Sequence, residues 1–60
     1  MSTPGTILVV DDDESLRSVI EYSLRQRGHT VVAVGSGAAA LERLPEGFDL
    51  VITDVLIGDI

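Results

Sequence analysis

Apolar and polar residues follow one another along this chain in blocks that predict strands and helices in turn. Residues 6–10, 30–34 and 49–53 are short, almost continuously apolar and rich in β-branched side chains, which predicts three buried strands. The stretches between them are longer, and their apolar residues recur at three- and four-residue intervals, which predicts helices. The expected element order is therefore strand, helix, strand, helix, strand.

The longer predicted helix begins near Glu14. Asp12 or Asp13 is expected to cap its start and Gly28 to end it. Its apolar stripe is expected to pack on the sheet and its polar residues to lie on the opposite side. The apolar stripe consists of Leu16, Val19, Ile20 and Leu24, and the polar side of Arg17, Glu21, Arg25 and Gln26.

A shorter helix is predicted over residues 37–44. Ser36 is expected to cap it, and Pro45 and Gly47 to end it. Its apolar stripe is expected to consist of Ala38, Leu41 and Leu44.

This order predicts a single α/β domain in which right-handed crossovers make the three strands parallel. We expect residues 1–5 to form a flexible leader and residues 6–60 a partial domain, because no helix follows to cover the third strand. An apolar strand at an open edge is a template for pairing with another chain. We therefore expect self-association through the third strand, with Leu50 and Ile52 exposed in the monomer.

Composition narrows the function. The 60 residues carry a net charge of −6 and no cysteine, which argues against nucleic-acid binding, disulfides and thiolate metal sites. A hydrophobic content of 45% argues against disorder. The chain has neither a signal peptide nor an apolar run of membrane-spanning length, so we expect a cytoplasmic protein without a membrane partner.

Carboxylates follow two of the predicted strands. Asp11, Asp12 and Asp13 come directly after the first, and Asp54 follows the third. Parallel strands have their carboxyl ends at one edge of the sheet, where ligands of open α/β folds bind. Carboxylates held together repel one another unless a cation or a proton is present, so this edge is a predicted metal site.

The acidic motif and its surroundings resemble the first half of a response-regulator receiver domain. The similarity rests on residues 7–12, 35–41 and 48–54 and on the helix that begins near Glu14. It implies a flavodoxin-like doubly wound parallel sheet, here truncated to strand order 2-1-3. It also implies a phosphoacceptor signalling domain rather than an enzyme that turns over a substrate.

Carried over by position, the resemblance makes Asp54 the phosphoacceptor. It implies that Asp11, Asp12, Asp54 and the backbone carbonyl of Leu56 hold Mg²⁺ or Mn²⁺, and that the phosphoryl group comes from a histidine kinase or a phosphotransfer protein. Two departures stand out: Ile57-Gly58 replaces the family's usual Met-Pro, and the chain has no lysine for the family's switch position. The resemblance does not specify which kinase, output domain or signal is involved.

A dinucleotide-binding unit is one alternative. Gly35, Gly37 and Ala40 fit the G-x-G-x-x-A pattern between a strand and a helix. The pattern normally follows the first strand of its unit, and it leaves the acidic cluster unexplained.

A phosphatase fragment of the haloacid-dehalogenase type is the other alternative. Asp11 would be its nucleophile and Asp13 its acid/base within a D-x-D-x-(T/S) motif.

His29, at the turn before the second strand, is expected to be a surface residue away from the acids.

Overall fold

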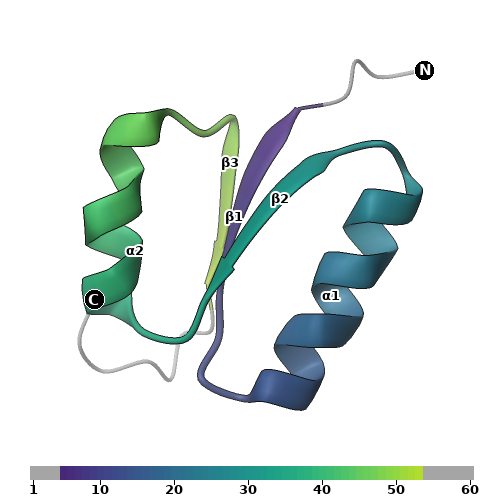
Figure 1. Ribbon diagram of the computed structural model, residues 1–60, viewed down its shortest axis with the longest axis horizontal. Coiled ribbons are helices and arrows are strands. Elements are labelled where there is room, and N and C mark those ends of the chain that lie inside the picture. Colours follow the sequence, from purple (N-terminus) through teal and green to yellow (C-terminus); the bar gives the residue numbers. More distant parts are fainter. Residues whose placement is uncertain (1–4, 54–60) are drawn as a thin grey trace.

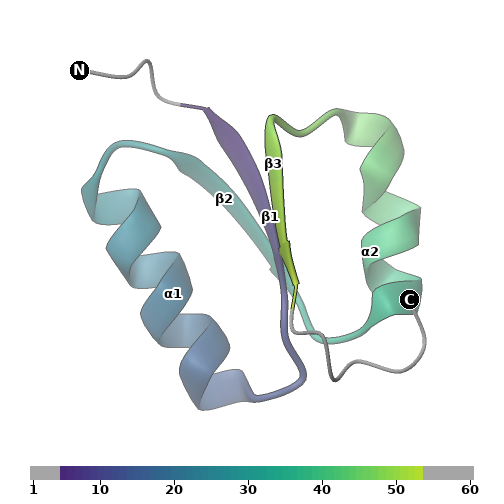
Figure 2. The same ribbon diagram turned by 180° about the vertical axis from the view of Figure 1, so that it is seen from behind.

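Three strands lie between two helices in the computed structural model, which describes residues 5–53 (Figure 1). The elements are, in chain order, β1 (Thr6–Val10), α1 (Glu14–Gln26), β2 (Thr30–Val34), α2 (Gly37–Arg43), the 3₁₀ turn η1 (Leu44–Glu46) and β3 (Leu50–Thr53). The view from behind also shows α1 and α2 on opposite sides of the sheet (Figure 2). The predicted element order is confirmed, and the second helix ends one residue earlier than expected.

The sheet is parallel throughout, in the order β2-β1-β3. This confirms the truncated flavodoxin-like α/β fold. β1 is the central strand, and Leu8 and Val9 are both fully buried because successive side chains of a strand point to opposite faces. Leu8 packs on the side of α2 and Val9 on the side of α1, so the first strand supplies the core of both layers.

Both ends of α1 follow the prediction. The Asp13 carboxylate accepts a hydrogen bond from the Leu16 N–H at 3.1 Å and caps the first turn. At the other end Gly28 adopts φ 90°, donates its N–H to the Arg25 carbonyl, and is followed by His29, whose N–H bonds the Leu24 carbonyl. This pair of bonds is a Schellman motif, which needs a residue with positive φ such as glycine.

The predicted apolar stripe of α1 is only half correct. Ile20 and Leu24 pack against the sheet, but Leu16 is 47% and Val19 61% exposed. Since α1 contacts β1 and β2 and not β3, the stripe is wider than the surface that the helix covers.

The prediction that the polar residues of α1 lie opposite the sheet is also wrong for some of them. Arg17 and Glu21 are half-buried, and the guanidinium groups of Arg17 and Arg25 donate hydrogen bonds to backbone carbonyls of Asp11 and Val31. Long side chains at the border of the helix face therefore reach back to the ends and edge of the sheet.

In α2 the prediction chose the wrong stripe. Ser36 caps the helix as expected, with its Oγ accepting from the Ala39 N–H at 3.1 Å. The buried residues are Gly37 and Ala40, however, whereas Ala38, Leu41 and Leu44 are exposed. Small residues allow the helix backbone to approach the sheet closely, and that contact decides the orientation of so short a helix.

β3 is thinly covered. Leu50 is 52% exposed on one face and Val51 41% exposed on the other. The expected exposure of Leu50 is confirmed, but that of Ile52 is wrong, because Ile52 pairs with Val9 and packs in the core on the α1 side.

Two side chains form hydrogen bonds with the backbone at the amino ends of the strands. His29 Nδ1 accepts a hydrogen bond from the Gly5 N–H at 3.1 Å, so this histidine is half-buried rather than a simple surface residue. The Asp49 carboxylate accepts from the Thr6 N–H at 2.8 Å, while the Asp49 N–H donates to the Thr6 carbonyl. This reciprocal pair fixes the register of β3 on β1. Gly5, assigned to the leader by sequence, is thus bonded, and residues 1–4 lie outside the described part.

Within residues 5–53, neither helix has the length and apolar character that crossing a bilayer requires.

Candidate functional site

The predicted site lies at the carboxyl end of the sheet, where β1 and β3 finish side by side. Val10 and Thr53 are paired in the register of these two strands. Asp11 follows Val10 directly, and Asp54 is the next residue after Thr53 in sequence. Asp54, Leu56 and the Ile57-Gly58 pair lie outside the described residues, so the predictions made for them stay predictions.

Asp11 is built into the end of the sheet. It is 4% exposed, and its N–H donates to the Val34 carbonyl at 3.1 Å, which continues the contact between β1 and β2 by one residue. Its Oδ1 accepts a hydrogen bond from the Asp13 N–H at 2.8 Å. The carboxylate therefore has a fixed position before any ligand arrives.

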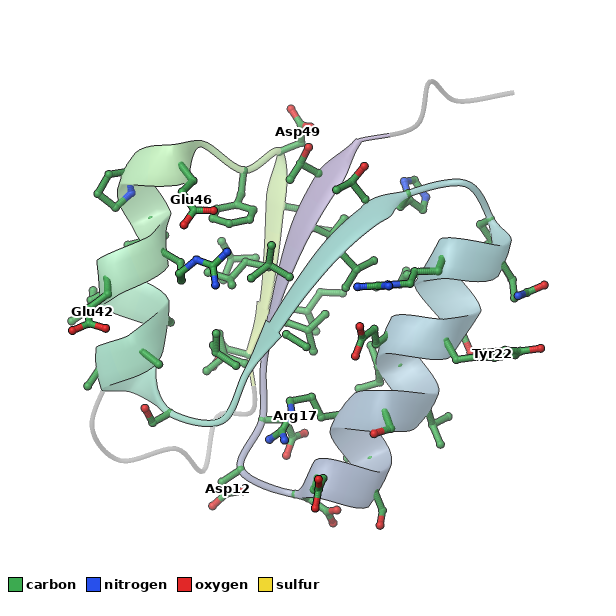
Figure 3. All side chains as sticks on the ribbon, viewed as in Figure 1. Asp12, Arg17, Tyr22, Glu42, Glu46 and Asp49 are labelled. Carbon is green, nitrogen blue, oxygen red and sulfur yellow. The ribbon has the colours of Figure 1, made fainter. Side chains whose placement is uncertain are left out.

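Asp12 and Asp13 take two different places in the same loop. Asp12 is exposed, and its side chain points away from the fold at the end of β1 (Figure 3). Asp13 caps α1 with its carboxylate. Of the three neighbouring acids, Asp13 thus has a structural role, while Asp11 and Asp12 remain as candidates for cation binding.

The described residues supply only part of a metal shell. Among residues 5–53, no group of three histidine, cysteine, aspartate or glutamate side chains is arranged to hold a metal ion. Two adjacent carboxylates are nevertheless suitable for Mg²⁺, which takes hard oxygen ligands and commonly keeps several water molecules. The donor types present fit the predicted ion, and the further ligands expected for it are Asp54 and the Leu56 carbonyl.

A basic residue that the helical pattern does not predict lies at this site. Arg17 reaches from the first turns of α1 toward the end of β1 (Figure 3), and its Nη1 donates to the Asp11 carbonyl at 2.8 Å. An arginine on an amphipathic helix ordinarily marks the solvent side, so the helical pattern alone places it there. Its spacing of six residues from Asp11 is the available signal, because the first turns of a helix lie beside the strand end that precedes them.

The glycine-containing segment after β2 has a structural explanation. Gly35 lies beside the Arg17 guanidinium, and Gly37 and Ala40 are buried where α2 meets the sheet. The segment follows an edge strand rather than the central one.

Comparison with known protein families matches residues 7–60 to the response regulator receiver domain. The chain therefore belongs to the receiver-domain family of two-component response regulators. The match extends over both the acidic loop and the glycine-containing segment after β2, so it accounts for features that the phosphatase and dinucleotide-binding alternatives explain separately.

Individual relatives agree with this family. The chain is 38% identical over 52 residues to the alkaline phosphatase synthesis transcriptional regulatory protein PhoP of Bacillus subtilis (strain 168), which covers 85% of this chain and 22% of that protein. It is 40% identical over 56 residues to the DNA-binding transcriptional regulator NtrC of Azospirillum brasilense, covering 92% of this chain and 12% of that protein. It is 37% identical over 51 residues to the transcriptional regulatory protein CpxR of Escherichia coli (strain K12), covering 85% and 22%.

The chain thus spans about a fifth or less of the length of these relatives. No solved structure gave a significant match.

Proposed function

We propose that this chain is the phosphoacceptor part of a two-component response regulator, with Asp54 as the residue that receives the phosphoryl group. The observation that carries the proposal is the pairing of Val10 with Thr53. It brings the strand that precedes Asp11 and Asp12 next to the strand that precedes Asp54. The family match supports the same assignment.

The proposed reaction is a phosphoryl transfer from the phosphohistidine of a histidine kinase or phosphotransfer protein. A carboxylate oxygen of Asp54 forms a bond to phosphorus as the P–N bond breaks, and the electron pair of that bond returns to the imidazole nitrogen of the donor. No oxidant or further co-reactant is needed. The product is an acyl phosphate on Asp54, so the chain is modified and does not turn over a substrate.

Asp11 and Asp12 would hold a divalent cation beside the acceptor, together with Asp54 and the Leu56 carbonyl. When bound, Mg²⁺ offsets the repulsion between the carboxylate and the phosphoryl oxygens. The protein's contribution is to hold Asp11 in place through the Val34 carbonyl and the Asp13 N–H. Asp12, exposed at the loop, is free to turn toward the ion.

The wider role also belongs to the proposal. The relatives are named as transcriptional regulators, so we place this segment upstream of an output unit that acts on transcription, in the cytoplasm. The acidic net charge of the segment argues that any contact with nucleic acid lies elsewhere.

Phosphorylation tests the assignment of Asp54. The natural protein that contains residues 1–60 is incubated with a small phosphodonor, with and without Mg²⁺. Labelling is expected only with the metal and is expected to disappear in Asp54→Asn. Labelling of Asp54→Asn that is lost instead in Asp11→Asn would show that Asp11 is the nucleophile and overturn the proposal.

Metal binding tests the acidic pair separately. Mn²⁺ is titrated and paramagnetic broadening of the amide signals is followed. Broadening is expected around Asp12 and is expected to weaken in Asp12→Asn. Glu42→Gln is the matched control, because Glu42 is an exposed acid that points away from the sheet on α2 (Figure 3). Broadening centred on Glu42 or Glu46 would contradict the site. Asp49 is less suitable as a control, since its carboxylate bonds the Thr6 N–H and holds β3 on β1.

A further inference from the structure

Arg17 is placed where a cation is unexpected. It is the fourth residue of α1, at the end of the first turn and near the positive end of the helix dipole, where a basic side chain is unfavourable. Among the described residues it forms no ion pair with the neighbouring aspartates, although three of them precede the helix. Its guanidinium is instead used on an uncharged group, the Asp11 carbonyl.

That carbonyl stands at the point where β1 and β2 separate. The Asp11 N–H still bonds the Val34 carbonyl, and β2 ends at Val34. In a parallel ladder the Asp11 carbonyl would next receive a backbone N–H from the adjacent strand. Arg17 Nη1 supplies a donor at this position, at 2.8 Å, and so extends the hydrogen bonding of the sheet by one group.

Gly35 makes room for this arrangement. A Cβ atom at Gly35 would lie 3.1 Å from Arg17 Nη1, which is closer than ordinary van der Waals contact. The guanidinium therefore lies beside both the loop after β1, which it bonds, and Gly35 in the loop after β2. A displacement of either loop would alter the hydrogen bond to Asp11.

We propose that Arg17 is a positioning residue for the acidic pair: through the Asp11 carbonyl it fixes the backbone that carries Asp11 and Asp12, the two carboxylates proposed to bind a divalent cation. This inference rests on the metal site of the proposed function. It adds that the affinity of this site depends on a residue that does not touch the ion, and on the absence of a side chain at Gly35.

Charge and positioning predict opposite effects for the loss of Arg17. A nearby positive charge that acted only by repulsion would weaken metal binding, so Arg17→Met would strengthen it. A positioning residue strengthens binding, and removal of such supporting groups typically weakens metal affinity by about tenfold or more. The sign of the change therefore separates the two roles.

The experiment measures the affinity for Mn²⁺ alone, by paramagnetic broadening, in the natural protein that contains residues 1–60. Arg17→Met is expected to weaken binding about tenfold. Arg17→Lys is expected to lose less affinity for Mn²⁺, because lysine keeps the positive charge and a hydrogen-bond donor but not the planar guanidinium group. Gly35→Ala is expected to weaken binding with every acid and arginine intact, and to shift the Asp12 and Asp13 amide signals without metal.

Arg27→Met is the matched control. Arg27 caps the far end of α1, is exposed, and its side chain makes no hydrogen bond or ion pair among the described residues. It removes the same charge and is expected to leave affinity nearly unchanged. Urea unfolding of each variant identifies losses that come from unfolding, and Gly35→Ala and Arg17→Lys remain informative if Arg17→Met is unfolded.

The outcomes distinguish the inference from the proposed function. Wild-type binding at Asp12 that is unchanged or tighter in Arg17→Met, or unchanged in Gly35→Ala, overturns the positioning role and leaves the metal site intact. A wild-type protein that does not bind Mn²⁺ at Asp12 overturns both.

Discussion

The two edges of the sheet are finished in different ways. At the β2 edge, Arg25 of α1 donates to the outward Val31 carbonyl at 3.0 Å and pairs with Glu21 at 2.7 Å. At the β3 edge, residues 50–53 include no charged side chain, and both faces of the strand carry exposed apolar residues. A side chain of α1 thus bonds one edge, whereas within residues 5–53 neither helix contacts the strand at the other edge.

One row across the sheet makes the contrast quantitative. Val31, Ile7 and Leu50 lie side by side in the register of the three strands. Val31 is 5% exposed at its edge, whereas Leu50 is 52% exposed at the other. The position of a strand at an edge does not by itself leave its residues exposed. What differs is that α1 covers β2 and neither helix covers β3.

The largest expected effect comes from truncating the two ends of that row. Val31→Ala is expected to lower the free energy of unfolding by about 2 kcal/mol, because it removes buried methyl groups and leaves a cavity. Leu50→Ala removes more atoms but is expected to cost less than about 1 kcal/mol, since half of the side chain is already in water. Urea unfolding followed by circular dichroism measures both. Equal costs would contradict the asymmetry between the edges.

A charge on β3 should prevent pairing through its edge. The polypeptide of residues 1–60 is expected to associate with itself and to lose structure on dilution, and Val51→Lys is expected to weaken association by about tenfold or more, roughly 1.4 kcal/mol. Sedimentation equilibrium measures the change. Leu41→Lys is the control, because Leu41 is 55% exposed on α2 and away from the strand edge. A monomeric wild-type polypeptide with cooperative, concentration-independent unfolding would refute this edge as a pairing surface.

Removing the covering side chain tests the β2 edge. Arg25→Met is expected to destabilise the fold by about 1 kcal/mol, the usual net value of one hydrogen bond, since water can partly replace the donor at Val31. Arg27→Met removes the same charge two positions along and is expected to have little effect. If the two variants lose equal stability in urea, the hydrogen bond to the strand edge has no special role.

The smallest effect is expected from an ion pair that touches neither edge. Arg43 donates two hydrogen bonds to the Glu46 carboxylate between α2 and η1, and both side chains are largely in contact with solvent. These bonds, and to a lesser degree the positive charge, hold the pKa of Glu46 below its ordinary value. Glu46 in turn raises the pKa of Arg43 through the same hydrogen bonds and its negative charge.

The direction of the effect of pH on stability follows from the lowered pKa of Glu46. A depressed folded-state pKa of Glu46 means that its small contribution to stability is present above the unfolded-state pKa and is lost as pH falls through the folded-state pKa. Carboxyl carbon signals in an NMR titration should show Glu46 titrating at higher pH in Arg43→Met. High salt should reduce the difference. A pH profile of unfolding that changes markedly in this variant would show that the pair matters more than its exposure suggests.

Sequence patterns predicted the strands well because β1 is buried on both faces, which requires a continuous apolar run. The acidic loop was also accessible to prediction, since Asp13 precedes a helix and Asp11 follows a strand. The faces that the helices turn toward the sheet could not be predicted in this way. In α2 the contact with the sheet selects the smallest residues, Gly37 and Ala40, whereas hydrophobicity selects Leu41.

The roles of two arginines depend on how α1 lies on the sheet, which the spacing of polar and apolar residues along the sequence does not reveal. Arg17 and Arg25 share the polar pattern of α1, yet one bonds the end of the central strand and the other bonds the sheet edge. Which carbonyls they reach is set by how α1 lies across β1 and β2. The same reasoning applies to Asp49, whose bond to Thr6 joins positions that are far apart in sequence.

The position of β1 has a consequence for synthesis in the cell. The strand that becomes most buried is made first, and its two neighbours arrive later: His29 is 24 positions beyond Gly5, and Asp49 is 43 beyond Thr6. At translation rates of about 5–20 residues per second, β2 follows after about 1–5 s and β3 after about 2–9 s. During that interval the apolar segment Ile7-Leu8-Val9-Val10 is available to chaperones and to other nascent chains. Packing of α1 and β2 against this segment ends its exposure on one side. The rest of the core forms only after β3 has been synthesised.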